Sequence, residues 1–410
     1  MTTTGPALGD SGRELAREVL IHGPIARADL GRRLGLSPAS LTRLSKPFLD
    51  RGLFVEGPER QDGAVGRPAK PLDVRVDSQR FVGVKLTGEQ ALGVLTDLRA
   101  RTLASAVVDL PGHGVEQVVE AVVAVVERLS ADRGAGAADA GAGAAGAGAG
   151  AVDVGVGAAH AGDRPAGVGV SVGGKVIGSS VVARAPFLDW RAVDHGALLA
   201  ERLGLPVVIE NDVVALVEAE HWFGLGRGVD NFAVVTTGAG VGYGLVMHGR
   251  QVVTADTGLG LGGHFPIDPT GPICLDGHRG CSTAMLSTTS MCASARGGLG
   301  RDVEYDELLA LAAEGNPVAA QVVGTAGRSL GHMIAAVANL TMVDTVVLSG
   351  EGIGLLEVPL AVVEMRAGLA ADRDPDASEV RVLVGADDFG AWARGAAAVA
   401  IQARFGALAG

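Results

Sequence analysis

The stretch GLSPASLTRLSKPFLDRG, residues 35–52, decides how the amino-terminal part of the chain folds. Gly35 suits the left-handed conformation that ends a helix. Ser37 and Pro38 can start the next helix, because serine caps free amide groups and proline fits the first helical position. The apolar positions then predict a helix from Ala39 to about Arg51, with a kink or an early turn at Pro47.

The residues on either side extend this stretch into a winged helix-turn-helix. Apolar residues at helical spacing predict two preceding helices, at 14–22 and 26–34. Two short strands are expected at 53–55 and 72–76, around a loop rich in Gly, Pro, Arg and Lys that forms the wing. We therefore assign residues 1–78 to a winged helix-turn-helix domain, the outline of a DNA-binding module.

Charge is distributed unevenly along the chain. The whole sequence carries a net charge of −12, but residues 13–51 hold eight Lys or Arg against four acidic residues. Such a basic segment can bind phosphates while side chains of the third helix reach base edges, so double-stranded DNA is the expected partner. A small helical bundle with a solvated charged face is the competing interpretation. The predicted DNA-contacting residues are Ser37, Ala39, Ser40, Thr42, Arg43, Lys46, Arg67 and Lys70.

From residue 79 the pattern changes to alternating strands and helices, which predicts a mixed α/β architecture. Residues 134–151 are all Gly or Ala except Asp139. Because such side chains bury little surface, we expect a flexible insertion over 134–162; an Ala-rich helix is the alternative.

Other features argue against several classes of protein. The most apolar stretch, 115–129, carries three glutamates and is too short to cross a membrane, which indicates an amphipathic surface helix. The N-terminal residues lack the apolar core of a signal peptide, so we expect no membrane association and a cytoplasmic location. Three cysteines cannot form a disulfide framework, and their grouping within 274–292 indicates metal ligation or simple burial.

Several motifs together resemble the ROK family (repressor, ORF, kinase), and in particular its xylose and N-acetylglucosamine type repressors. They are GRPAKPL at 66–72, END at 210–212, AGVGYG at 239–244, and GH at 263–264 with CLDGHRGC at 274–281. The resemblance runs from about Glu14 to the C-terminus. It implies a two-lobed actin-like (ribonuclease H-like) sugar-kinase fold, with residues 79–195 and 391–410 in the small lobe and 196–390 in the large lobe.

The resemblance also implies that catalysis has been lost. The family's first phosphate motif, Asp-x-Gly-Gly-Thr, corresponds to residues 85–89 here, so Lys85 replaces the metal-side carboxylate and Glu89 the threonine. Both changes oppose binding of Mg²⁺-ATP, and we expect neither ATP binding nor enzyme activity. Asp212 matches the family's general base and Asn211 a sugar-contacting residue; helix capping explains this pair equally well.

The sugar site implied by the resemblance is altered too. Leu261 and Thr283 stand where the family has acidic residues, and Phe187 where it often has asparagine. Losing carboxylates that accept paired hydroxyl hydrogen bonds weakens sugar binding. We therefore expect a modified sugar, a less polar molecule, or no effector. The effector-binding residues implied are Asn211, Asp212 and His264.

The resemblance further implies a structural zinc site. Its ligands would be His264, Cys274, Asp276 and Cys281, with Asp276 in place of a family cysteine. Zn²⁺ accepts all three ligand types, and four protein ligands leave no open position. Two buried thiols beside a surface aspartate are the alternative.

The function expected from these features is that of a DNA-binding regulator, namely a repressor, that acts as a homodimer or homotetramer. A sugar kinase that carries a DNA-binding domain is the enzymatic alternative, motivated by Asp212 and the glycine-rich loop at 239–244. A third interpretation is a DNA-binding protein without an effector, whose lobes serve only for assembly.

Overall fold

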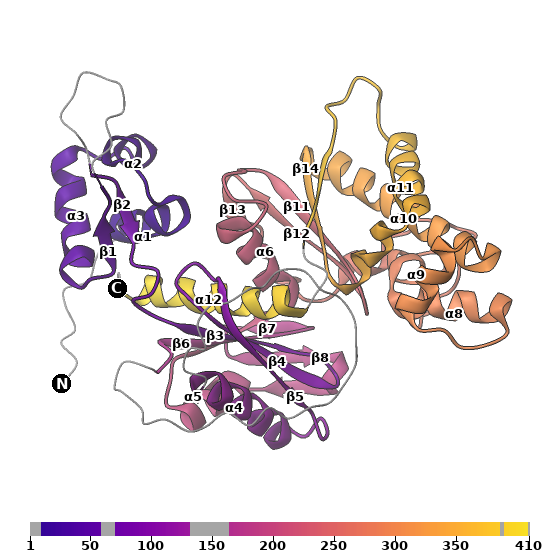
Figure 1. Cartoon of the computed structure of the whole chain (residues 1–410), viewed down its shortest axis with the longest axis horizontal. Helices are drawn as coiled ribbons and strands as arrows, with labels where there is room; N and C mark the ends of the chain where they lie inside the picture. Colours follow the sequence, from indigo (N-terminus) through magenta and orange to yellow (C-terminus); the bar gives the residue numbers. More distant parts are fainter. Residues whose placement is uncertain (1–9, 59–69, 132–163, 386–388, 409–410) are drawn as a thin grey trace.

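The computed structural model describes residues 10–58, 70–131, 164–385 and 389–408 of the chain. Figure 1 shows an N-terminal module and two lobes, each of which contains a five-stranded sheet. The insertion predicted at 134–162 lies outside the described residues. None of the helices in the described ranges combines the length and the apolar character that a membrane crossing requires.

The N-terminal module, residues 10–76, has the predicted order of elements. Its helices are α1 (Asp10–His22), α2 (Arg27–Leu34) and α3 (Pro38–Asp50), and its antiparallel strands are β1 (Phe54–Glu56) and β2 (Leu72–Val74). Gly35 ends α2 at a φ of 62°, and the Ser37 hydroxyl caps α3 by accepting a 3.2 Å hydrogen bond from the Ser40 amide. The early turn considered at Pro47 does not form, since α3 continues to Asp50 and is anchored there by the fully buried Phe48.

The first lobe is built on a sheet with the strand order β10-β6-β3-β4-β5. Its strands are β3 (Phe81–Leu86), β4 (Gln90–Thr96), β5 (Thr102–Asp109), β6 (Gly167–Val172) and β10 (Val207–Asn211). The first three form an antiparallel meander, and β6 and β10 run parallel to β3. Helices α4 (Val115–Ala131) and α5 (His195–Leu203) cover one face (Figure 1). Residues 196–211, which we expected in the large lobe, lie in this one, because β10 pairs with β6.

The second lobe repeats the same arrangement, with the order β13-β12-β11-β14-β15. Its strands are β11 (Phe232–Thr237), β12 (Val241–Met247), β13 (Arg250–Gln251), β14 (Thr345–Ser349) and β15 (Arg381–Val384). Its helices are α6 (Asp212–Phe223), α7 (Ser282–Leu286), α8 (Thr288–Leu299), α9 (Tyr305–Ala313), α10 (Pro317–Thr341) and α11 (Pro359–Ala371), with 3₁₀ turns η2 (Leu261–His264) and η3 (Glu351–Glu357). In both sheets the first strand is central, which is the duplicated pattern expected for the actin-like fold.

A small three-stranded sheet adds to the first lobe. It consists of β7 (Lys175–Ile177), β8 (Val181–Ala185) and β9 (Trp190–Val193), with the 3₁₀ turn η1 (Pro186–Leu188) before the last strand. This sheet places Phe187 and Arg184 beside the cavity described below.

The C-terminal helix α12 (Phe389–Leu408) packs on the face of the first sheet opposite α4 (Figure 1). Glycine in two neighbouring strands makes this close approach possible. A Cβ on Gly83 would lie 2.0 Å from the Ala393 carbonyl oxygen, and one on Gly169 would lie 1.8 Å from that of Ala396. Both distances are far below van der Waals contact, so any larger residue would force α12 away from the sheet.

The N-terminal module shares its hydrophobic core with the lobes. One buried cluster joins Leu20 and Phe48 of the module to Phe81 of β3, Trp222 of α6 and Ile401 of α12. Arg99 of the first lobe adds hydrogen bonds to the Gly23 carbonyl and to Asp73. The module is therefore held against α6 and α12 by packed side chains.

Candidate functional site

A cavity of about 460 Å³ is lined by residues of both lobes. It lies at the carboxyl ends of strands from both sheets: Lys85 is the last residue but one of β3, Asn211 ends β10, Thr237 ends β11, and Glu351 follows β14. Sheets of this kind bind ligands at these ends, because loops and helix N-termini converge there. The cavity is thus the candidate effector site.

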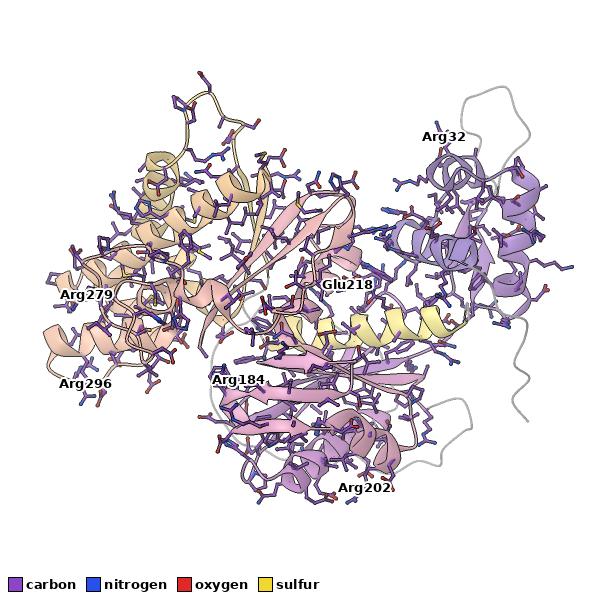
Figure 2. The ribbon with its side chains drawn as sticks, turned by 180° about the vertical axis from the view of Figure 1, so that it is seen from behind. Arg32, Arg184, Arg202, Glu218, Arg279 and Arg296 are labelled. Atoms are coloured by element: carbon purple, nitrogen blue, oxygen red, sulfur yellow. The ribbon has the colours of Figure 1, made fainter. Side chains whose placement is uncertain are left out.

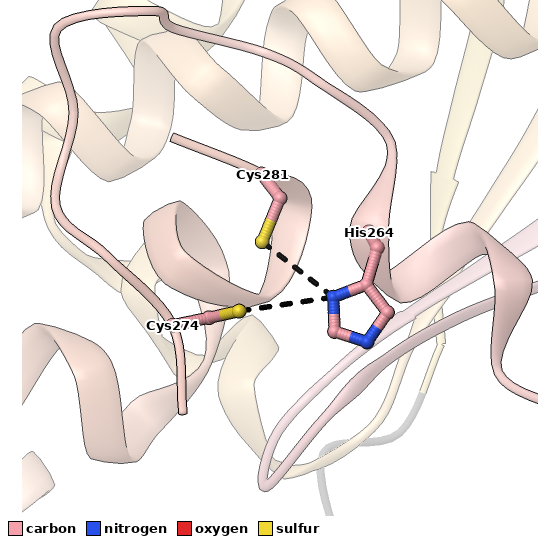
Figure 3. Close-up of side chains that lie close together, drawn as sticks. All are labelled: His264, Cys274 and Cys281. Carbon is pink, nitrogen blue, oxygen red and sulfur yellow. Dashed lines mark hydrogen bonds between the residues drawn. The ribbon is translucent and has the colours of Figure 1, made fainter. Parts of the chain in front are cut away.

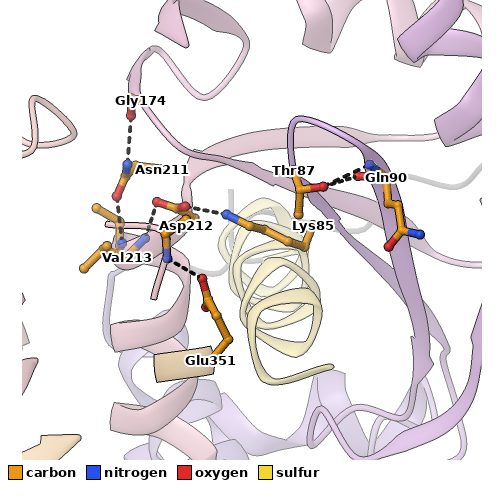
Figure 4. A network of polar contacts seen from close by, with 10 residues as sticks. Lys85, Thr87, Gln90, Gly174, Asn211, Asp212, Val213 and Glu351 are labelled. Carbon is orange, nitrogen blue, oxygen red and sulfur yellow. Dashed lines mark hydrogen bonds and ion pairs between the residues drawn. The ribbon is translucent and has the colours of Figure 1, made fainter. Parts of the chain in front are cut away.

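Two charged side chains inside this cavity form an ion pair (Figure 4). The Lys85 ammonium group donates a hydrogen bond to the Asp212 carboxylate, and the two side chains are only 8% and 15% exposed. Lys85 Nζ also lies 4.9 Å from the centre of the Trp392 ring, within the range of a cation–π interaction. The carboxylate at the family's general-base position is therefore bound by a cation of the protein itself.

Replacing Lys85 with methionine is expected to lower the free energy of unfolding by about 3 kcal/mol, because Asp212 would keep a mostly buried charge without a partner. Denaturant titration of the full chain measures this change. The double variant Lys85→Met/Asp212→Asn should recover most of the loss, since it leaves no unpaired charge. A single variant as stable as the parent would show that the ion pair has no net energetic role.

The Asn211 side chain links two segments of the cavity wall by hydrogen bonds. Its side-chain oxygen accepts a 3.1 Å hydrogen bond from the Val214 amide and so caps α6, while its Nδ2 donates to the Gly174 carbonyl at 2.8 Å. Of the two explanations for this residue, the structure favours capping.

The three positions that differ from the family's sugar site are not grouped together. Leu261 and Phe187 line the cavity, with exposed fractions of 64% and 55%. Thr283 lies in α7 and faces the backbone at Gly263. His264 is absent from the cavity lining among the described residues, although η2, which it ends, contributes Leu261.

His264 lies in a cluster with two buried cysteines (Figure 3). Its Nδ1 is 3.8 Å from the Cys274 sulfur and 3.7 Å from the Cys281 sulfur. The donor atoms of these three residues all lie within 4.8 Å of one another. In a tetrahedral zinc site with Zn–S of about 2.3 Å and Zn–N of about 2.1 Å, neighbouring donor atoms are roughly 3.4–3.8 Å apart. The cluster therefore has the dimensions and the donor chemistry of a zinc site.

The fourth position differs from the expectation. Neither Asp276 nor His278 belongs to this three-residue cluster. The Asp276 carboxylate is 3.3 Å from Nε2 of His264, the ring nitrogen that faces away from the sulfurs. His278 is nearer, with its Nδ1 3.7 Å from the Cys274 sulfur and 3.1 Å from Nδ1 of His264. The family motif does not identify His278 as a candidate ligand, because this residue falls between two motif positions. Its spacing of four residues from Cys274 is the feature of the sequence that could have indicated it.

The predicted DNA-contacting residues of α3 form one exposed stripe. Ala39, Thr42, Arg43 and Lys46 follow the spacing i, i+3, i+4, i+7, opposite the buried side of the helix. Arg43 and Lys46 take part in no ion pair among the described residues, whereas Arg27, Arg32 and Arg33 of α2 each pair with an acidic side chain. Ser37, Ser40 and Lys70 are at or near the surface, and Arg67 lies outside the described residues.

Arg17 of α1 links the module to α6. Its Nη2 donates a 2.7 Å hydrogen bond to the Gly249 carbonyl, and its guanidinium carbon lies 5.7 Å from the centre of the Trp222 ring.

Glu218, one turn earlier in α6 and labelled in Figure 2, accepts a hydrogen bond from Gln402 of α12. Burial raises the pKa of Glu218 to about 7, and the charge of Arg17 opposes this rise. Helix α6 thus runs from Asp212 in the cavity to Trp222 against the module.

Comparisons with known proteins agree with this arrangement. The model of the family described as "ROK family" matches residues 156–403. The DNA-binding transcriptional repressor Mlc of Escherichia coli is 24% identical over 329 residues, which cover 78% of this chain and 75% of that protein. A glucokinase of Thermotoga maritima is 43% identical over 106 residues, but these cover only 26% of this chain and 33% of the enzyme.

A solved structure extends the comparison to the whole chain. The crystal structure of a ROK family transcriptional regulator, described as a homologue of the Escherichia coli Mlc protein, superposes with a TM-score of 0.76 at 22% identity. The superposition covers 98% of each chain. The fold of the N-terminal module and of both lobes is therefore shared with that protein.

Proposed function

We propose that this chain, which belongs to the ROK family, is a DNA-binding transcriptional repressor whose lobes sense a small molecule instead of phosphorylating it. The observation that carries the proposal is the exposed stripe on α3, which has the charge and spacing of a recognition helix. In this proposal residues 1–78 form a winged helix-turn-helix, and Arg67 and Lys70 of the wing contact phosphates or a minor groove. The similarity to a protein named as a DNA-binding repressor supports the same function.

The proposal includes a symmetric mode of binding. Helix-turn-helix regulators bind two half-sites one helical turn apart, or multiples of it, so the protein would act as a homodimer or homotetramer on a two-fold operator. In this proposal the regulator acts in the cytoplasm, where its operator DNA is located.

Selection of bound fragments from the native genome, followed by footprinting with the full chain, tests the proposal. We expect a small set of sites with two-fold symmetry, bound at least about a thousandfold more tightly than random DNA of equal length. Equal binding of selected and random fragments would refute a sequence-specific regulator.

The kinase alternative is not favoured by the cavity. Phosphoryl transfer needs a free base and a carboxylate near the metal, but Asp212 is paired and Lys85 is a cation. We therefore propose that the protein neither binds Mg²⁺-ATP nor phosphorylates sugars.

We further propose a structural zinc ion held by His264, Cys274 and Cys281, with His278 completing the set. The donor distances and the two sulfur ligands support zinc. The ion would supply a cross-link between η2 and the loop before α7. In this arrangement Asp276 orients the His264 ring through Nε2, as carboxylates commonly do beside zinc-bound histidines.

In this proposal, helix α6 couples effector binding in the cavity to the DNA-binding module. Asp212 in its first turn lines the cavity, and Trp222 in its last turn packs in the core shared with α1. A ligand that binds one arrangement of α6 more tightly than another would shift the population of DNA-competent states.

A further inference from the structure

Among the described residues, five large apolar side chains that are open to solvent line the cavity. Phe187 comes from η1, Tyr243 from β12, and the others from the loop after β13 and from η2. Proteins seldom leave large apolar side chains exposed together unless a ligand or a partner covers them. The set comprises Phe187, Tyr243, Val252, Leu259 and Leu261.

Two of these apolar side chains, Phe187 and Tyr243, lie where a polar ligand would need hydrogen-bond partners. A Cβ added to Gly173 would lie 3.3 Å from a ring carbon of Phe187 and 3.3 Å from Oδ2 of Asp212, so the phenyl ring and the carboxylate both approach this glycine. Tyr243 packs over Gly262, the neighbour of Leu261: a Cβ on that glycine would be 2.4 Å from the tyrosine ring. The apolar surface therefore extends from the ion pair to η2.

The polar side chains of the cavity are largely engaged within the protein. Asp212 is bound to Lys85, and both polar atoms of the Asn211 amide have partners. Glu351 accepts a 2.8 Å hydrogen bond from the Ala239 amide, and Gln251 donates a 3.0 Å hydrogen bond to the Val214 carbonyl. The hydroxyl groups of a free hexose would lose water without finding enough replacements, which costs affinity.

Two charged side chains of the cavity remain open to a ligand, and the buried hydroxyl oxygen of Thr237 has no hydrogen-bond partner among the described residues. Arg184 of β8 and Asp256 line the cavity and are exposed. The Arg184 guanidinium group and the Asp256 carboxylate take part in no hydrogen bond or ion pair among the described residues, although the Asp256 amide donates to the Thr254 hydroxyl. A few well-placed polar groups on an otherwise apolar surface are typical of sites for amphipathic small molecules.

From this distribution we infer that the cavity binds a glycoside with an aromatic aglycone, and that a free hexose is a poor ligand. The aglycone packs against Phe187, Tyr243 and Leu261, while hydroxyl groups of the sugar reach Asp256 and Arg184. The inference rests on the proposed sensor function and names its class of effector.

Isothermal titration of the full chain with phenyl β-D-glucoside and methyl β-D-glucoside tests the inference, because the two probes differ only in the aglycone. We expect the phenyl compound to bind at least about tenfold more tightly, since the ring buries apolar surface. The variant Phe187→Ala/Leu261→Ala should lose this advantage. Leu340→Ala removes a side chain that is 74% exposed in α10, outside the cavity, and should keep it.

Equal affinity for both glucosides, an advantage that survives in the double variant, or no measurable binding of the phenyl compound would each overturn the inference. Because Phe187 and Leu261 are exposed, both variants should fold, which circular dichroism checks. The titration contains no DNA, so it is independent of the genomic selection. Glucoside binding without operator binding would remove only the repressor function, and the reverse result would remove only this ligand class.

Discussion

Replacing Arg43 and Lys46 together with alanine is expected to weaken binding to the selected operator by about a hundredfold. Each cation that contacts a base or a phosphate contributes about 1–3 kcal/mol to binding. Both side chains are exposed on α3 and have no acidic partner among the described residues, so the protein itself loses little stability. The slope of log K against log salt concentration should also fall by about two, because two fewer phosphate counterions are released. Fluorescence anisotropy at several salt concentrations measures both quantities.

Arg296→Ala/Arg366→Ala provides a matched control. These arginines are exposed on α8 and α11 of the second lobe, and their removal changes the net charge of the protein by the same amount. We expect the control to bind the operator within about twofold of the parent, since long-range charge effects are screened at physiological salt. If the control loses as much affinity as the α3 variant, the α3 stripe is not the DNA-contacting surface.

Replacing Cys281 with serine is expected to abolish binding of zinc, whereas Cys292→Ser should retain one ion per chain. Cys281 is in the His264 cluster and Cys292, in α8, is not. A bound ion stabilises the folded state by about 4 kcal/mol when its free concentration is a thousand times Kd, so the Cys281 variant should also unfold at lower denaturant concentration. Elemental analysis of the dialysed protein and denaturant titration with and without a chelator make the measurement. Parent protein that carries no zinc would contradict the proposal.

The same experiment separates the two candidates for the fourth ligand. His278→Ala should lower zinc affinity more than Asp276→Asn does, because a ligand is lost in the first case and only an orienting contact in the second. Loss of an orienting carboxylate typically lowers metal affinity by about 10–100-fold. A larger effect at Asp276 would return it to the ligand set. The Co²⁺-substituted protein would report the change of ligand by its visible absorption spectrum.

The core strands and the N-terminal helices could be predicted because their patterns are local. Every residue of β3, Phe81–Leu86, is buried, and all but Gly83 and Lys85 are apolar side chains, so the strand is visible as a short apolar run in the sequence. The strand β12 could not be identified in the same way. Its residues include Gly242 and Gly244, which resemble a loop, but they allow Val213 and Val217 of α6 to pack closely against the strand. The small sheet β7-β8-β9 was missed because its strands are short and only partly buried.

The sequence by itself determined the helix-turn-helix, the α/β character of the remainder and the resemblance to the ROK family, since these depend on spacing along the chain. Only the tertiary structure decided that Lys85 neutralises Asp212, 127 positions away, that Asp276 faces the outer nitrogen of His264, and that α6 and the N-terminal module share a core. Each of these contacts joins segments that are brought together by packing of the sheets and α12. Side-chain pairing in a folded protein depends on such packing geometry, which residue order alone does not specify.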